Sequence, residues 1–375
     1  MKIVSSSPSK TCLLDPIPTS LLKQCVDKLM PILTVIINLS LTTGTVPQSL
    51  KNAVVSPILK KSSLDSNIFK NYRPVSNLPF LSKVIEKVVA SQLITYLGTN
   101  SLLEPLQSAY KKHHSTETAL LKVHNDICTA LDRGQCVLLI LLDLSAAFDT
   151  IDHDILITRL SKLGITGITL QWFSSYLKNR TQSLARWNQQ FKKSKPDETN
   201  KLQLNDSKTE VLFIRSQFNR LPRPIDHINI GSSCIQLAKS ARNIGVTFDD
   251  QHSLQHHIAL TCRSIYHHLR TIGRIRHYLT DEACKMLVHA LITTKLDYCN
   301  SLLYGLPAKD ILPLQHAQNT AARMVSRTRK FNHITPVLIN LHWLQVVFRI
   351  QYKTLLITYK ALHDSTPIYI RLNPP

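Results

Sequence analysis

The chain has 375 residues, 43% of them hydrophobic, which is enough for one large or two medium globular units. Its 45 Lys and Arg residues against 24 acidic residues give a formal net charge of +21. Such an excess indicates a polyanionic partner, since basic side chains set against phosphates release condensed counterions. The alternative is a generically basic protein of ribosomal type, and charge alone indicates no chemistry.

Long apolar runs and the first residues of a chain indicate whether a protein enters a membrane or is secreted. The longest apolar run, 137–142, is strand-sized, so we expect no membrane partner. Residues 1–10 lack the apolar core of a secretory signal, so we expect an intracellular protein, cytoplasmic or nuclear, and not secreted. The cysteines are scattered, with no Cys-x-x-Cys pair and no Cys/His cluster at zinc spacing, which indicates core thiols and no metal finger.

Apolar periodicity predicts the regular elements in chain order. Helices are expected over 21–32, 85–97, 115–131, 155–163 and 170–177, and strands over 53–59, 137–142, 211–214 and 243–248. Residues 71–74 are expected to form a turn, because Pro74 follows there. Residues 183–201 show no clear period and are expected to be a linker. From about Leu254 the pattern becomes helical to the end of the chain.

The strand predicted over 137–142 is continuously apolar and stops at Asp143. A continuous apolar run is typical of a strand buried on both faces. A carboxylate at the end of such a strand could bind Mg²⁺, and two-metal phosphoryl transfer requires carboxylates placed in this way. The alternative is that Asp143 caps the following turn, and spacing alone leaves both interpretations open.

Several segments resemble the motifs of LINE-type (non-LTR) reverse transcriptases, most closely those of vertebrate elements. The segment 141–153, LLDLSAAFDTIDH, is similar to the first palm motif, and 70–78, KNYRPVSNL, resembles the finger motif. Further similar blocks lie at 107–120, 204–210, 296–303, 334–337 and 341–344. The resemblance covers nearly the whole chain. It implies an α+β fold with fingers and palm, followed by a mostly helical thumb and C-terminal region.

The resemblance also implies a division of the chain into five parts. These are a helical region preceding the fingers (1–50), the fingers with the first part of the palm (51–182), a deletion junction or linker (183–201), a palm remnant (202–250), and the helical thumb and C-terminal region (251–375).

Catalytic roles follow from the resemblance at two positions. Asp143 would be a metal ligand for Mg²⁺, the cofactor of the intact family. Lys208 would lie near the nucleotide as a charge stabiliser or proton donor. Asp149 and Asp152 are instead expected to be structural or helix-capping carboxylates.

Nucleotide contacts are implied at four further positions. Phe148 would lie under the sugar of the incoming nucleotide and exclude a 2′-hydroxyl. Arg73, with Lys60 and Lys61, would face the triphosphate or template from the fingers. The alternatives are that Arg73 anchors the turn at Pro74 and that Phe148 is a core residue.

Arginines on the predicted C-terminal helices lie largely outside the apolar stripe. They are expected to hold the RNA template and DNA primer: Arg263, Arg270, Arg274, Arg323 and Arg327. The alternative is an ordinary solvated helix surface.

Two family blocks are missing before Lys208, a Pro-Gln-Gly loop and an aromatic-x-Asp-Asp hairpin that supplies the paired carboxylates. Phe248-Asp249-Asp250 does not replace the hairpin, because it follows Lys208 and leads into a polar segment; Asp249 is expected to be structural. The palm sheet should therefore be incomplete, with exposed strand edges around Leu139 and Phe213.

We therefore expect an RNA-directed DNA polymerase by descent, internally deleted, truncated at its N-terminus and catalytically inactive, since one carboxylate compensates two divalent ions poorly. Mg²⁺ would not be bound productively. The alternatives are a non-catalytic basic RNA- or DNA-binding remnant, and a gene-model artefact with no stable product.

Overall fold

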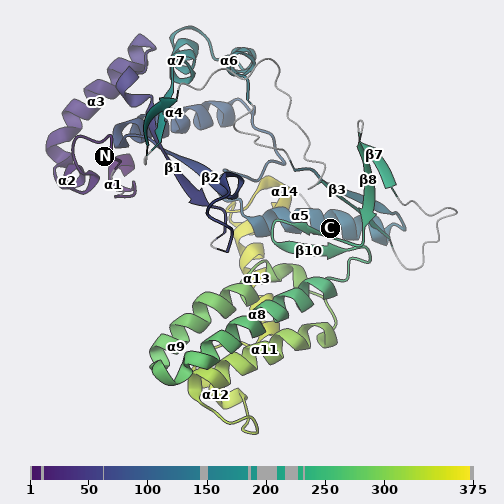
Figure 1. Ribbon diagram of the computed structural model, residues 1–375. Helices are drawn as coiled ribbons and strands as arrows, with labels where there is room; N and C mark the ends of the chain where they lie inside the picture. The colour runs from purple at the N-terminus through teal and green to yellow at the C-terminus, as the bar shows by residue number, and fades with distance from the viewer. Residues whose placement is uncertain are drawn as a thin grey trace. The chain divides into compact units, whose positions relative to one another are not determined.

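The computed structural model describes residues 2–9, 12–61, 63–143, 151–184, 187–191, 209–215, 227–230 and 233–371. Helices and small sheets are mixed along the chain (Figure 1). The chain forms two compact units, each made from two segments. The first unit comprises 1–103 and 146–203, and the second comprises 104–145 and 204–375. These units cross the boundaries expected from the sequence, because 104–145 joins the C-terminal half.

The first unit contains a four-stranded sheet in the order β2-β1-β4-β5. Its strands are β1 (Asn52–Leu59), β2 (Tyr72–Asn77), β4 (Thr181–Leu184) and β5 (Trp187–Phe191). β1 pairs antiparallel with β2 and parallel with β4. Pro57 of β1 lies opposite Pro74 of β2. The pairing with β4 covers only 52–55 of β1, so among the described residues β1 has no strand on its other side at Pro57. Proline is tolerated there because its missing N–H interrupts no ladder.

Two local predictions fail in this sheet. Residues 72–74 belong to strand β2 and are not a turn; the bend lies earlier, in the short helix η2 (Phe69–Asn71). Residues 183–184 and 187–191 belong to the β4–β5 pair and are not a linker. These residues form strands because β4 pairs with β1 and β5 pairs with β4, although their own sequence shows no strand or helix period.

The helices of the first unit pack around two small clusters of buried side chains. One cluster centres on Trp172 with Ile85 and Val89, and the other on Phe80 with Val84. The helices are α1 (Lys2–Ser5), α2 (Thr19–Gln24), α3 (Val26–Thr43), η1 (Gln48–Leu50), α4 (Phe80–Thr99), α6 (His153–Lys162) and α7 (Gly167–Leu177).

Helix α3 corrects an expectation about membranes. Its 18 residues are long and apolar enough to cross a bilayer, so the prediction that no segment has this length and composition is wrong. Core helices of soluble proteins and signal sequences have the same composition, and α3 contacts α7 through a hydrogen bond from Trp172 Nε1 to Ser40 Oγ, 3.1 Å long. Length and composition alone therefore do not establish a membrane span.

The second unit contains a sheet in the order β3-β6-β8-β7 and a separate β9–β10 hairpin. The strands are β3 (Val137–Leu141), β6 (Glu210–Ile214), β7 (His227–Ile230), β8 (Ser233–Ala238), β9 (Ser240–Asn243) and β10 (Val246–Asp249). The strand predicted over 243–248 is confirmed for Val246–Phe248, which belong to β10, but Ile244 and Gly245 form a turn that separates β10 from β9. Gly245 allows that turn, with a φ of +88°.

The other prediction to fail here concerns burial. Leu138 and Ile140 are 42% and 39% exposed, so β3 is not buried on both faces. β3 is an edge strand among the described strands, as expected around Leu139. The edge around Phe213 is not open, because β6 pairs with β3 on one side and with β8 on the other.

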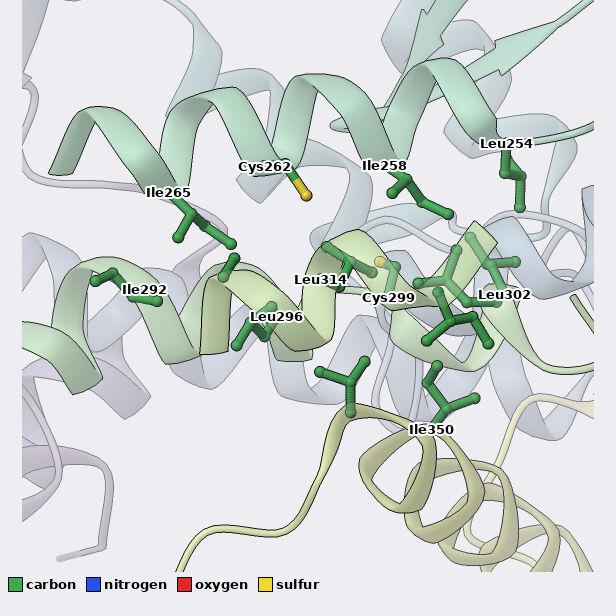
Figure 2. Packing of buried hydrophobic residues seen from close by; sticks show 14 of the residues in the cluster. Leu254, Ile258, Cys262, Ile265, Ile292, Leu296, Cys299, Leu302, Leu314 and Ile350 are labelled. Carbon is green, nitrogen blue, oxygen red and sulfur yellow. The ribbon is translucent and has the colours of Figure 1, made fainter. Parts of the chain in front are cut away.

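The core of the second unit lies between α8 and the helices that follow it. Leu254, Ile258, Cys262 and Ile265 point from the α8 side toward Leu296 and Leu314 (Figure 2). The helices are α5 (Thr116–Asp132), α8 (Gln255–Ile275), η4 (Arg276–Tyr278), α9 (Asp281–Val288), η5 (His289–Thr293), α10 (Thr294–Asp297), η6 (Asn300–Leu303), α11 (Ala308–Ser326), α12 (Thr335–Asn340), α13 (Val346–Leu362) and α14 (Ile368–Arg371).

Candidate active site and nucleic-acid interface

Asp143 follows strand β3 in the second unit and is partly buried. β3 is aligned antiparallel to β6, with Leu141 opposite Glu210. One carboxylate oxygen of Glu210, Oε2, accepts the backbone N–H of Arg242 at 3.2 Å. Within the described part of the chain, Asp143 belongs to no group of three side chains that could share a metal ion.

Two predicted site residues cannot be located around Asp143. Phe148 and Lys208 lie outside the described residues, as does Asp149. Asp152 is described, and its carboxylate accepts the backbone N–H of Asp154 and of Ile155, which confirms its predicted role as a helix cap.

The three basic residues expected in the fingers lie close together on the β1–β2 pair of the first unit. Arg73 lies opposite Ile58 in the register, and Lys60 follows β1 with its N–H donated to Asn71. Arg73, Lys60 and Lys61 are exposed. The alternative that Arg73 anchors a turn at Pro74 is wrong, because both residues are within β2.

Asp249 has the structural role that the sequence predicted. It is 9% exposed, and its carboxylate accepts the backbone N–H groups of Gln251, Ser253 and Leu254. These bonds use both oxygens to fix the loop between β10 and α8. The Phe248-Asp249-Asp250 segment is therefore not arranged as a catalytic carboxylate pair.

Helix α8 separates an apolar face from a basic one. Arg263, Arg270 and Arg274 recur at seven- and four-residue intervals and are all exposed, while the buried face carries residues such as Ile265 and Leu269. This spacing places the three arginines on one side of the helix. In the described structure none of the three guanidinium groups takes part in an ion pair, so their charge faces solvent; we call them the α8 basic stripe.

Arg323, within α11, and Arg327, the residue after α11, have other contacts. Arg323 is partly buried and donates to the carbonyl of Asn332, and Arg327 forms an ion pair with Asp281 at 3.4 Å. Unlike the arginines of the α8 basic stripe, these two already contact other groups of the protein. Their predicted contact with nucleic acid stays a prediction.

A pocket beside α8 was not predicted. Its lining includes Arg242, His257, Lys295 and Tyr298, together with hydroxyls such as those of Thr261 and Ser264. Burial, and secondarily Arg242, lower the pKa of His257. Cationic and hydroxyl groups around one cavity suit an anion such as a phosphate. These residues are spread over strands and helices, so only the four- and three-residue spacing of His257, Thr261 and Ser264 was visible in the sequence.

Comparison with known proteins shows which family the residues around β1, β2 and Asp143 resemble. Residues 58–199 match the family described as reverse transcriptase (RNA-dependent DNA polymerase). Over 155 residues the chain is 27% identical to the RNA-directed DNA polymerase from mobile element jockey of Drosophila melanogaster, covering 41% of this chain and 17% of that protein. Over 131 residues it is 29% identical to the probable RNA-directed DNA polymerase from transposon BS of the same organism, covering 35% and 14%.

A third relative is the probable RNA-directed DNA polymerase from transposon X-element of Drosophila melanogaster, 27% identical over 151 residues. The chain spans well under a fifth of the length of these curated relatives, 14–17%. The matching residues include the β1–β2 basic group and Asp143. Residues 58–199 are therefore similar to the reverse transcriptases of non-LTR mobile elements.

Proposed function

We propose that this chain is an RNA-directed DNA polymerase by descent that has lost catalysis and can still hold nucleic acid. The observation that carries the first part is the position of Asp143. It follows the strand that the family motif predicts, yet it stands in no group of three possible metal ligands among the described residues.

Two divalent ions bound at one site require several carboxylate oxygens, both for charge compensation and for geometry. Asp143 supplies one carboxylate, and no group of three possible metal ligands among the described residues includes it. The described residues thus do not fit a two-magnesium site, and we assign no catalytic step to Mg²⁺ here.

The β3–β6 pairing supports the family assignment of Asp143. Asp143 follows Leu141, the register partner of Glu210, by two residues. The far edge of β3 has no strand partner in the described sheet, and Leu138 and Ile140 are exposed. An additional hairpin with the missing carboxylates would find an open edge there. An internal deletion is consistent with that edge.

Binding without catalysis is the second candidate function, and the α8 basic stripe favours it. Helix α8 presents three solvated arginines on the side away from its buried face. The pocket lined by Arg242, His257 and Lys295 supplies a further cationic surface in the same unit. Backbone phosphates are the ligands that such groups bind without sequence preference. We assign this unit to the thumb and palm remnant, and the β1–β2 pair to the fingers.

Primer extension tests the proposed loss of catalysis. The full chain is incubated with a DNA primer on an RNA template, Mg²⁺ and deoxynucleotides, beside Asp143→Asn and Asp250→Asn, with an intact family enzyme as positive control. We expect no extension by the full chain above the level of Asp143→Asn. Extension that Asp143→Asn abolishes and Asp250→Asn retains would show an active site and overturn the proposal.

Circular dichroism with thermal melting tests the remaining alternative, that the chain forms no stable product. The buried core of the second unit predicts a cooperative melt. A broad, non-cooperative loss of helical signal would show that the chain does not fold as described, and both candidate functions would fail with it.

A further inference from the structure

Two histidines and a cysteine meet in the second unit, away from Asp143 in the sequence. His124 and Cys128 lie one helical turn apart on α5, so both side chains lie on the same face. His252 reaches them from the loop between β10 and α8. One potential ligand atom from each of the three side chains lies within 4.8 Å of the other two.

A single tetrahedral metal ion would need one ligand atom from each of the three side chains. With Zn–S of about 2.3 Å and Zn–N of about 2.0–2.1 Å, a sulfur and a nitrogen ligand lie about 3.6 Å apart, and two nitrogens about 3.3 Å apart. The Cys128 Sγ to His124 Nε2 distance is 3.7 Å. His252 Nε2 faces the other nitrogen of that ring, His124 Nδ1, at 2.8 Å. Because one imidazole binds an ion through one nitrogen, His124 would use Nε2 beside Cys128, and His252 would have to turn from Nδ1 toward that nitrogen.

The loop that carries His252 is held firmly. The Asp249 carboxylate accepts N–H groups on both sides of His252, from Gln251 and Ser253. His252 itself has a φ of +56°, a left-handed conformation that a residue with a side chain adopts at a cost. Its ring stacks on Phe248 with centroids 5.6 Å apart and planes 3° apart. These contacts keep the imidazole beside His124 before any ligand binds, which is what a metal site requires.

The hydrogen bond between the two rings leaves one polar atom unaccounted for. Nδ1 of His252 is buried and has no hydrogen-bond partner in the described structure. A buried polar atom without a partner destabilises the folded state. A neutral imidazole carries a lone pair on one of its two nitrogens, and that nitrogen can bind a cation. In the histidine pair only Nε2 of His252 has a partner, and Nδ1 has none.

We propose that His124, Cys128 and His252 bind one divalent ion of the zinc class, with the fourth position open to water. A thiolate and two imidazoles form a donor set that zinc accepts and that Mg²⁺ does not favour. The site is therefore separate in chemistry from the polymerase's magnesium. It would tie α5, in the segment 104–145, to the loop preceding α8, in the segment 204–375, and so join the two parts of the second unit.

Cobalt(II) substitution tests the site on the full chain, since a thiolate ligand gives Co²⁺ a charge-transfer band in the near ultraviolet. We expect one equivalent of Co²⁺ to produce the band and Zn²⁺ to displace it. Cys128→Ser should remove the band. His252→Asn should weaken binding by more than the roughly 10–100-fold that loss of an outer hydrogen-bond partner costs a metal site. Matched controls are Cys136→Ser and His256→Asn, which should bind as the wild type does.

A second measurement needs no variant at the site. In the wild-type chain, Zn²⁺ should protect Cys128 from alkylation, as mapped by mass spectrometry, and leave the exposed Cys234 reactive. Zinc should also raise the melting temperature. Absence of a cobalt band, a band that survives Cys128→Ser, or equal alkylation of Cys128 with and without zinc would each overturn the proposal. The three residues would then be a hydrogen-bonded histidine pair beside a thiol.

Discussion

The carboxylate of Asp249 accepts the backbone N–H of Leu254 at 2.8 Å, across the loop that joins strand β10 to helix α8. Leu254 is the residue before α8, is fully buried and has a φ of +58°. The helix has no capping side chain at Leu254 itself. Asp249 therefore fixes the start of α8 from five residues upstream, in addition to binding Gln251 and Ser253.

Asp249→Asn should destabilise the second unit without touching a catalytic group. The amide keeps one accepting oxygen and points its NH₂ toward a backbone N–H, so at least one buried N–H loses its acceptor. Such a loss costs about 1–3 kcal/mol. Urea unfolding followed by circular dichroism should show a lower midpoint. Asp250→Asn is the control, because Asp250 is held through its backbone. Its N–H donates to the carbonyl of Lys239, and its carbonyl accepts the N–H of Arg215. An equal loss in both variants would contradict the assigned role.

The hydrogen bond between Trp172 and Ser40 predicts coupling in the first unit. Both side chains are buried, at 3% and 4% exposure, and the bond is 3.1 Å long. Ser40→Ala leaves the indole N–H unpaired, whereas the same change in a Trp172→Phe background does not. A double-mutant cycle should therefore give a coupling of about 0.5–3 kcal/mol. Pairing Ser40→Ala with Trp343→Phe, in the second unit, should give additive effects; coupling there, or none with Trp172, would contradict the prediction.

His257 predicts a pH dependence of stability. Its Nδ1 accepts the backbone N–H of Thr247 at 3.4 Å, and burial lowers its pKa from 6.5. Below about pH 6.5 the unfolded chain takes up a proton that the folded chain resists, so stability falls as the pH is lowered through this window and rises as it is raised. Between pH 7 and pH 5, the urea midpoint of unfolding should fall less for His257→Asn than for wild type. The amide oxygen of Asn can accept the same N–H but does not titrate in this range. His256→Asn, an exposed neighbour, should follow the wild type.

Local patterns in the sequence predicted much of the fold. Ser115 was expected to start a helix and caps α5 through the N–H of Thr118, because a hydroxyl before an apolar helical period satisfies a free backbone donor. The apolar face of α8 and its arginines outside that face were likewise visible from spacing. Features that depend on contacts between residues three or four positions apart can be predicted directly from the sequence.

Features set by distant partners were missed for physical reasons. The β4–β5 residues have no helical or alternating period, and pairing with β1 makes them strands. Exposure of Leu138 depends on what covers the sheet, which an apolar run does not report. Of the proposed metal ligands, His124 and Cys128 have helical spacing in the sequence, but His252 is brought to them only by the fold. Phe148 and Lys208 stay predictions.

The α8 basic stripe predicts a salt-dependent affinity for nucleic acid. Changing Arg263, Arg270 and Arg274 to Ala removes three exposed charges and leaves the buried face of α8 intact. If each contacts a phosphate, the slope of log affinity against log salt should become shallower by roughly 2–3, since each contact contributes about 0.7–0.9. Fluorescence anisotropy with an RNA–DNA hybrid measures it. The charge-matched control changes Arg159, Lys162 and Lys178, which are exposed in the first unit. An equal change of slope in both variants would assign binding to net charge and remove the stripe's role.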